Sequence, residues 1–369
     1  MPGNTAAMTK PSKNALITAI TDADPQAIAS ARRAGLVYVS DDQPGISRRR
    51  AGKGFSYVDA NGKKIVKKDE LQRLRSLAVP PAYTHVWICG VPEGHLQATG
   101  RDARSRKQYR YHPEWRSTRD HGKFSRLAEF GSALPALRRR LKLDLALAGL
   151  PDAKVLAAVI SLLEETLVRV GNIQYVRENR SFGLTTLRSR HAAIKRGGQI
   201  NFRFRGKGGV EHDVSVEDAR LARIVRQCQQ LPGQSLFQYL DEDGHHRPID
   251  SGRVNDYLHD AMGESFTAKD FRTWGGTVRA IAVLARTPLP ENASERDVGA
   301  VLADVVREVA SELRNTPAVC RKSYIDPRVF EAWRDGSLQR MLPPSGRLAP
   351  RQLEALAGRL LKRTGRRAK

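Results

Sequence analysis

The sequence is poor in cysteine and has no long apolar segment. Its three cysteines, Cys89, Cys228 and Cys320, are far apart and odd in number, so neither a disulfide framework nor a zinc knuckle is expected. No apolar run is long enough to cross a membrane. The first residues, MPGNTAAMTKPSKNA, lack the apolar stretch of a secretory signal. We therefore expect a cytoplasmic protein in a reducing compartment, with no membrane partner.

Acidic residues are too few to balance the basic ones. Lys and Arg total 63 against 39 Asp and Glu, which gives a formal net charge of +24. A soluble protein this basic usually binds a polyanion. Because no isolated basic amphipathic helix is evident, nucleic acid is favoured over an anionic membrane surface. Composition alone fits a non-enzymatic architectural DNA-binding protein, or a merely basic soluble surface, equally well.

Nucleotide-binding and metal-binding patterns are also missing. The Gly-Lys pairs at 52–53 and 206–207 are each followed by glycine, whereas the phosphate loop of ATPases needs Ser or Thr there. Neighbouring histidines on a glycine-containing turn seldom converge on one ion, so no metal site is predicted in DEDGHHRPID. The metal-ligand residue types in that stretch are Asp241, Asp243, His245 and His246. We expect no ATP, metal or other cofactor.

Three regions of the chain differ in pattern. Residues 1–32 hold scattered small and polar residues and are expected to form a flexible arm. Residues 33–118 contain a predicted strand, GLVYVS, and a hairpin signal at Asn61-Gly62, so a β-rich domain is expected. Residues 119–369 read as mostly helical with a small β insert and a disordered basic tail. The predicted fold class is therefore α+β.

Helix and strand signals in the last region are clear. The stretch 151–172 has apolar residues at helical spacing and is expected to end at Gly171. In QINFRFR, apolar and polar residues alternate as in a half-exposed strand, and GKGG follows as a turn. Thr-Pro at 316–317 predicts the start of a helix that carries Tyr324.

Four separated segments hold the residue types that phosphodiester cleavage needs. Arg169 lies in TLVRVGNIQY, near the predicted end of a helix, and Lys207 lies at a glycine-flanked hairpin tip. Arg272 lies in KDFRTWGGT, and Asn315 stands nine residues before Tyr324. Taken singly, each has an ordinary explanation: an exposed helix residue, a turn lysine, the partner of a nearby acid, or a core tyrosine. The order of the segments makes them informative.

Together these segments resemble the type IB DNA topoisomerases, in particular the compact poxvirus-like and bacterial branch. The motifs that carry the resemblance are GRDARSRKQYRYHPEWR, VRVGNIQYVRENRSFGLTTLRSRH, FRGKGG, KDFRTWGGT and NTPAVCRKSY, in this order, and it covers about 35–361. The resemblance implies an enzyme that relaxes positive and negative supercoils by transient single-strand nicking, without ATP or metal. It also implies a nucleoid-associated monomer whose two domains form a clamp around double-stranded DNA.

The resemblance assigns a role to each candidate residue. Tyr324 would be the nucleophile that forms a 3′-phosphotyrosyl bond. Arg169 and Arg272 would offset the negative charge of the transition state, a task that suits a planar, protonated guanidinium. Lys207 would be the general acid that protonates the leaving 5′ hydroxyl. Many family members have histidine where this chain has Asn315, which is expected to donate a hydrogen bond without moving a proton.

The resemblance also implies positions that contact DNA. In RSRKQYRYHP the basic side chains suit phosphates, while the glutamine suits base edges. Two further positions lie near the expected cleavage site. The residues expected to contact DNA are Arg106, Lys107, Gln108, Tyr109, Tyr111, Tyr175 and Lys269.

A tyrosine recombinase or integrase is the first alternative, because it uses a similar set of Arg, Lys, Arg and Tyr. Recombinases usually place histidine three residues before the second arginine, where this chain has Lys269. Their N-terminal DNA-binding domain is commonly helical, whereas this one is expected to be β-rich. An architectural DNA-binding protein, the second alternative, would bind DNA in a salt-sensitive manner without forming a covalent adduct.

Overall fold

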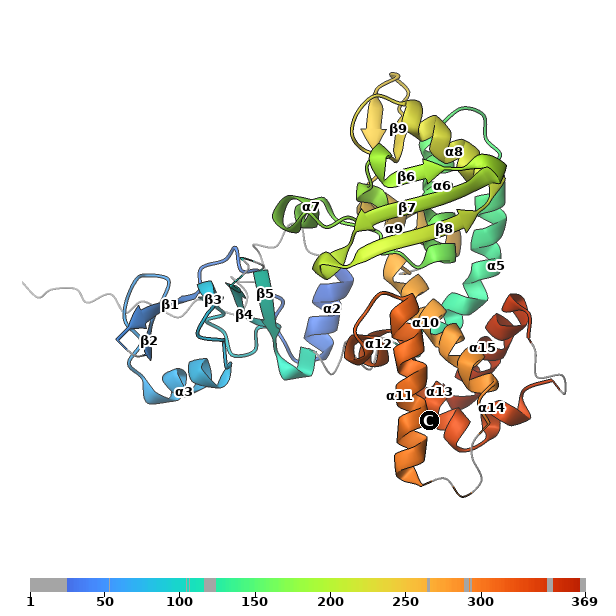
Figure 1. The fold of residues 1–369 in the computed structure, drawn as a ribbon. Coiled ribbons are helices and arrows are strands. Elements are labelled where there is room, and N and C mark those ends of the chain that lie inside the picture. Colours follow the sequence, from blue (N-terminus) through green and yellow to red (C-terminus); the bar gives the residue numbers. More distant parts are fainter. Residues whose placement is uncertain are drawn as a thin grey trace, which may run out of the picture. The chain divides into compact units, whose positions relative to one another are not determined.

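The chain forms two compact units, residues 1–123 and 124–369, in a computed structural model (Figure 1). The structure describes residues 25–52, 54–103, 105, 107–115, 124–263, 266–288, 292, 294–343 and 348–365. Within these ranges, no helix is both long enough and apolar enough to span a bilayer.

The N-terminal unit is built on an antiparallel sheet of five strands in the order β2-β1-β3-β4-β5. Apolar residues from β1, β3 and β4 meet Leu74 of α3 in a small core that includes Ile46, Val86, Ile88 and Ala98. The elements are α2 (Pro25–Arg33), β1 (Ile46–Ala51), β2 (Gly54–Val58), α3 (Lys68–Ser76), β3 (Thr84–Ile88), β4 (Leu96–Arg101) and β5 (Lys107–Tyr111).

The prediction of a flexible arm over residues 1–32 is wrong for its last residues, from Pro25 onward. Helix α2 lies there, and Ala27 and Ala31 on one of its faces pack against Leu36 and Trp115 in a separate apolar cluster. Small side chains four residues apart let the helix approach the indole closely, so tertiary packing orders a segment whose composition looked irregular. The rest of the predicted arm, residues 1–24, lies outside the described ranges.

The strand predicted over GLVYVS is also not formed. Val37 makes one isolated bridge with Gly94, and its backbone N–H and C=O bond to Glu93 and His95 in the loop before β4. The loop satisfies the hydrogen bonds of these backbone groups. Leu36 and Val39 are therefore buried although the segment does not become a strand of the sheet.

The C-terminal unit is mostly helical, with a three-stranded antiparallel sheet in the order β6-β7-β8 and a small hairpin, β9-β10. The helices are α5 (Leu127–Asp144), α6 (Asp152–Thr166), α7 (Ile173–Asn179), α8 (Ala219–Gln230), α9 (Ser251–Met262), α10 (Ala268–Ala285), α11 (Glu295–Glu312), α12 (Pro317–Tyr324), α13 (Pro327–Arg334), α14 (Ser337–Arg340) and α15 (Pro350–Gly365). The strands are β6 (Ala192–Ile194), β7 (Gln199–Arg205), β8 (Glu211–Glu217), β9 (Gln238–Leu240) and β10 (His246–Pro248).

Helix α10 is the central element of this unit, and it contacts α5, α6, α9, α11, α12, α13 and α15 (Figure 1). Two glycines in its FRTWGGT segment allow close packing. A β-carbon at Gly275 would lie 2.2 Å from the Leu167 side chain, and one at Gly276 would lie 2.5 Å from the carbonyl oxygen of Tyr324. Since such distances are below van der Waals contact, only glycine lets these two segments approach the helix.

Candidate active site

The predicted nucleophile lies at the C-terminal end of the short helix α12. Thr316 caps this helix by accepting a hydrogen bond from the Val319 N–H (3.4 Å), and Pro317 occupies the first turn, as the sequence predicts. Tyr324 is its last residue and is only 8% exposed. The Thr277 hydroxyl of α10 donates to the Tyr324 carbonyl at 3.4 Å and so ties the end of α12 to the central helix.

Arg272, in the second turn of α10, lies directly beside this tyrosine. Its guanidinium carbon is 4.8 Å from the centre of the Tyr324 ring, and the residue is 4% exposed. One terminal nitrogen donates to the Leu167 carbonyl and the other to the Leu313 carbonyl at 2.9 Å. Nε is buried and has no partner within the described part of the chain. The guanidinium is therefore fixed in place by two carbonyls, while its Nε–H remains unpaired within the described ranges.

The alternative that Arg272 pairs with its neighbour Asp270 is not observed. Asp270 instead accepts hydrogen bonds from the backbone and hydroxyl of Thr267, at 2.8 and 2.9 Å, and so closes the start of α10. Burial, followed by the charge of Arg169, lowers the pKa of Arg272 below its ordinary value. The cost of holding a cation here indicates a site prepared for an anion.

Arg169 does not lie on a helix, which corrects the sequence prediction. Helix α6 ends before Leu167, whose backbone is left-handed (φ 53°), rather than at Gly171. The helix stops early because the Leu167 carbonyl bonds to Arg272 and its side chain fills the space over Gly275. The chain after Leu167 has no regular secondary structure up to α7, and Arg169 lies beside Asn315.

Asn315 follows α11 in a turn that positions its side chain. Arg314 has a left-handed backbone (φ 51°), and the Asn315 N–H bonds back to the Ala310 carbonyl at 2.9 Å. A terminal nitrogen of Arg169 donates to Asn315 Oδ1 at 2.5 Å. Asn315 Nδ2 is buried and finds no acceptor among the described residues. With its oxygen engaged by an arginine, the amide presents only donors to an incoming group.

The pKa of Tyr324 is lowered from its ordinary value of 10.0. Burial alone would raise it, but the charges of Arg272 and Arg169, a hydrogen bond from Arg272 and the charge of Lys269 outweigh burial. The balance favours the phenolate, which is the nucleophilic form of the side chain. Four of the predicted catalytic residues therefore lie close together in the fold: Arg169, Arg272, Asn315 and Tyr324.

The fifth, Lys207, lies at the exposed tip of the β7-β8 hairpin. Gly208 and Gly209 both have positive φ, 78° and 82°, so the glycines that follow the lysine form the turn. Lys207 Nζ lies 5.1 Å from the ring centre of Tyr175, which is 41% exposed on α7. The predicted general acid, Lys207, therefore contacts Tyr175, a predicted DNA-binding residue, rather than the arginine cluster.

Sequence reasoning missed one residue of this region, His212 on β8. It is 5% exposed and lines a cavity of about 450 Å³ together with Leu167, Arg272 and Leu313. Burial, then the charges of Arg169, Arg272 and Arg314, lowers its pKa to about 4. The alternation that begins at Ile200 was the available signal, because it predicts that Phe204 points into the core. In the hairpin, His212 is the residue opposite Phe204.

The predicted DNA contacts of the N-terminal unit lie on β5, an edge strand. Tyr109 and Tyr111 are 44% and 36% exposed, and their rings stack with centres 6.1 Å apart. Lys107 forms an ion pair with Asp41 (2.7 Å), and Gln108 donates to Asp102 (3.0 Å). Arg106 lies outside the described residues, and the exposed Lys269 lies in the first turn of α10.

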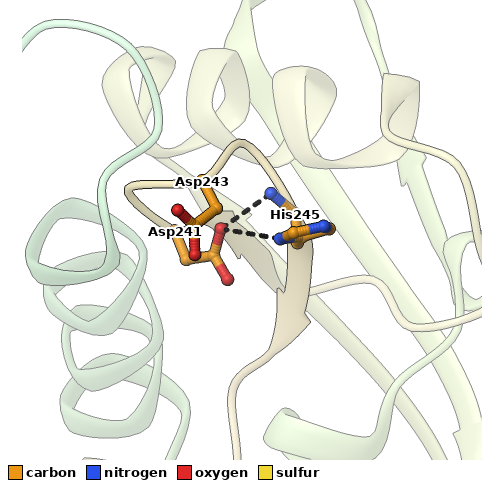
Figure 2. A group of neighbouring side chains, drawn as sticks. All are labelled: Asp241, Asp243 and His245. Atoms are coloured by element: carbon orange, nitrogen blue, oxygen red, sulfur yellow. Dashed lines mark hydrogen bonds and ion pairs between the residues drawn. The ribbon is translucent and has the colours of Figure 1, made fainter.

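The group Asp241, Asp243 and His245 lies on the turn between β9 and β10, with ligand atoms within 4.8 Å of one another (Figure 2). Asp241 already accepts hydrogen bonds from the His245 N–H (2.7 Å) and from Arg247 Nε (2.9 Å). These bonds use both carboxylate oxygens to close the turn. We therefore assign no metal site here.

Comparison with protein families and with curated proteins agrees with these observations. Residues 112–337 match the family "Eukaryotic DNA topoisomerase I, catalytic core", and residues 54–102 match "Bacterial DNA topoisomerase IB, N-terminal domain". DNA topoisomerase 1B of Acanthamoeba polyphaga mimivirus is 30% identical over 296 residues, which cover 79% of this chain and 88% of the viral protein. DNA topoisomerase 1B of vaccinia virus (strain Copenhagen) is 24% identical over 195 residues, 50% of this chain and 55% of its own.

These matches distinguish the chain from the recombinases and architectural proteins considered as alternatives. The catalytic-core match spans the arginine cluster and Tyr324, and the N-terminal match covers strands β2, β3 and β4 of the β-sheet unit. The chain belongs to the type IB DNA topoisomerases.

Proposed function

We propose that this topoisomerase cleaves one strand of duplex DNA by attack of the Tyr324 hydroxyl oxygen on a phosphodiester. The phenol loses its proton, the new P–O bond to Tyr324 forms, and the bond from phosphorus to the 5′ oxygen breaks. The products are a 3′-phosphotyrosyl enzyme and a free 5′ hydroxyl. Because the covalent bond retains the energy of the broken one, the 5′ hydroxyl can reverse the reaction without ATP or metal after the strand has rotated.

The observation that supports this proposal most directly is the set of unused donors around Tyr324. Arg272 Nε and Asn315 Nδ2 are both buried and lack acceptors among the described residues. A buried donor without a partner costs about 1–3 kcal/mol, so a site with two of them is prepared for a ligand rich in acceptors. The non-bridging oxygens of a phosphodiester supply such acceptors, and Arg169 and Arg272 stabilise the charge that builds on them during attack.

The leaving 5′ oxygen needs a proton, which we assign to Lys207. An alkoxide is a poor leaving group, so a positioned acid accelerates its departure. The hairpin places this lysine on an exposed tip, where it can enter a groove of bound DNA, and its ammonium lies over the Tyr175 ring. Proton delivery in cleavage and proton removal in resealing would then use the same group.

We further propose that the exposed aromatic and basic side chains already described bind the duplex. Tyr175 and Lys269 lie on the catalytic unit, near the hairpin tip and the nucleophile respectively. On β5, the stacked pair Tyr109 and Tyr111 presents flat surfaces, while Lys107 exchanges Asp41 for a DNA phosphate. Arg106 is assigned to phosphate contact on its sequence motif alone.

Relaxation of supercoiled plasmid in EDTA, without ATP, tests the proposal. Wild type should relax positive and negative supercoils and leave a covalent protein–DNA adduct when the reaction is stopped with detergent. Tyr324→Phe should bind DNA with unchanged affinity but form no adduct. Tyr239→Phe, which removes a hydroxyl from β9, is the matched control and should retain activity. Relaxation by Tyr324→Phe would contradict the assignment of the nucleophile.

A further inference from the structure

His212 connects the Lys207 hairpin to the arginine cluster from within the fold. It pairs with Phe204 across β7 and β8, and the two rings stack with centres 4.7 Å apart and planes 7° apart. A β-carbon at Gly206 would lie 2.5 Å from His212 Nε2. The imidazole therefore lies against the backbone of the residue that precedes Lys207, at the base of the tip.

The same ring forms part of the wall of the arginine cavity. Leu167 and Leu313, whose carbonyls hold Arg272, line that cavity with it. His212 Nδ1 is buried and has no hydrogen-bond partner in the described ranges. The imidazole thus contacts the hairpin that carries the proposed acid, and it lines one cavity together with Arg272 and the residues that hold it.

We propose that His212 is a positioning residue of the cleavage reaction, which sets the distance between the Lys207 hairpin and the arginine cluster. The inference depends on the proposed role of Lys207 as the acid. A flat ring that stacks on Phe204 resists tilting of the hairpin, and the absence of a β-carbon at Gly206 allows the contact. Burial, followed by the charges of Arg169, Arg272 and Arg314, disfavours the imidazolium, so the ring is uncharged at neutral pH.

A substrate that needs no acid separates positioning of Lys207 from a general structural role. If sulfur replaces the 5′ bridging oxygen at a mapped cleavage site, the leaving group is a thiolate. Since a thiol has a pKa of about 8.5, the thiolate departs without being protonated. Lys207→Ala should slow cleavage of ordinary DNA strongly and cleavage of the sulfur-substituted DNA little.

His212→Ala should show the same selectivity in single-turnover cleavage. We expect roughly a tenfold to hundredfold loss on ordinary DNA, as for a misplaced catalytic group, and little loss on the sulfur substrate. His212→Phe, which keeps the stacked ring, should recover most of the rate. His246→Ala, on the exposed strand β10, is the control and should leave both rates unchanged.

Gly206→Ala provides a second test that leaves His212 in place. Its methyl group would displace the imidazole or the hairpin, so it should cause the same selective loss. The double variant with His212→Ala should lose no more than either single variant, because both act through one contact.

The outcomes separate the two proposals. Equal losses on both substrates in His212→Ala, or no loss on either, would overturn the inference while leaving the proposed function intact. If wild type forms no adduct, or if sulfur does not restore cleavage by Lys207→Ala, the proposed function and the inference both fail.

Discussion

Acidification should destabilise the catalytic unit through His212. The pKa of this residue is about 4 in the folded protein, against 6.5 for an ordinary histidine, because burial and the charges of three arginines disfavour the imidazolium. As the pH falls through 6.5, His212 becomes protonated in the unfolded chain but stays neutral in the folded protein. The free energy of unfolding is therefore unaffected by His212 above pH 6.5. It falls as the pH drops from 6.5 to about 4, and below about 4 the loss is constant because both states are protonated.

The two pKa values set the size of this effect. The proton binding of the unfolded chain lowers the free energy of unfolding by about 2 kcal/mol at pH 5 and by about 3 kcal/mol near pH 4. A domain with an ordinary stability of about 5–15 kcal/mol would show such a change clearly.

Urea unfolding of wild type and His212→Phe at pH 8, 6 and 5 measures the difference. Trp274 and Trp333 are buried in the catalytic unit, so their fluorescence reports its unfolding. Other groups titrate in both proteins and cancel, so wild type should lose about 2 kcal/mol more than the variant between pH 8 and pH 5. Equal losses would refute the conclusion that burial and nearby arginine charges keep His212 uncharged in the folded protein.

Two further predictions concern the surroundings of the nucleophile. Gly276→Ala should displace the end of α12 and reduce cleavage more than DNA binding, since its β-carbon would lie 2.5 Å from the Tyr324 carbonyl oxygen. The same change at Gly299 of α11, where no described atom lies within 4 Å of the added carbon, should be harmless. Equal effects of the two variants in a cleavage assay would contradict the packing argument. Asn315→Ala should slow cleavage without changing the shape of the pH–rate profile, because an amide neither gains nor loses a proton near neutral pH, whereas Asn315→His should add a pH dependence near neutrality. Identical profiles for the two variants at this position would show that proton transfer plays no part there.

Local signals predicted several elements of the site correctly. The Thr-Pro pair at 316–317 starts α12 as expected, because capping and the fixed φ of proline act within a few residues. The alternation in QINFRFR predicted β7, and the glycines after Lys207 form the hairpin turn. The β-rich N-terminal unit and the mostly helical second unit were likewise predicted from periodicity and turn residues.

Predictions failed where distant segments override a local pattern. The helical spacing of 151–172 continues past Leu167, yet α6 stops there because Arg272 of α10 bonds to the Leu167 carbonyl. In the N-terminal unit, α2 forms where composition indicated an arm, because Trp115 provides the surface on which its alanines pack. Neither partner is near in sequence, so no window of the sequence contains the cause.

The sequence by itself determined the basic character of the protein and the order of its motifs, and it predicted Tyr324 as the nucleophile, because these depend on residue types and short-range spacing. Only the tertiary structure decided which charged groups lie near Tyr324. Arg272 is held by the carbonyls of Leu167 and Leu313, which come from either side of it in the chain, and Gly276 lets the end of α12 reach it. The lowered pKa of the tyrosine follows from charges brought near it by folding, and electrostatic interactions depend on distance in space rather than on separation along the chain.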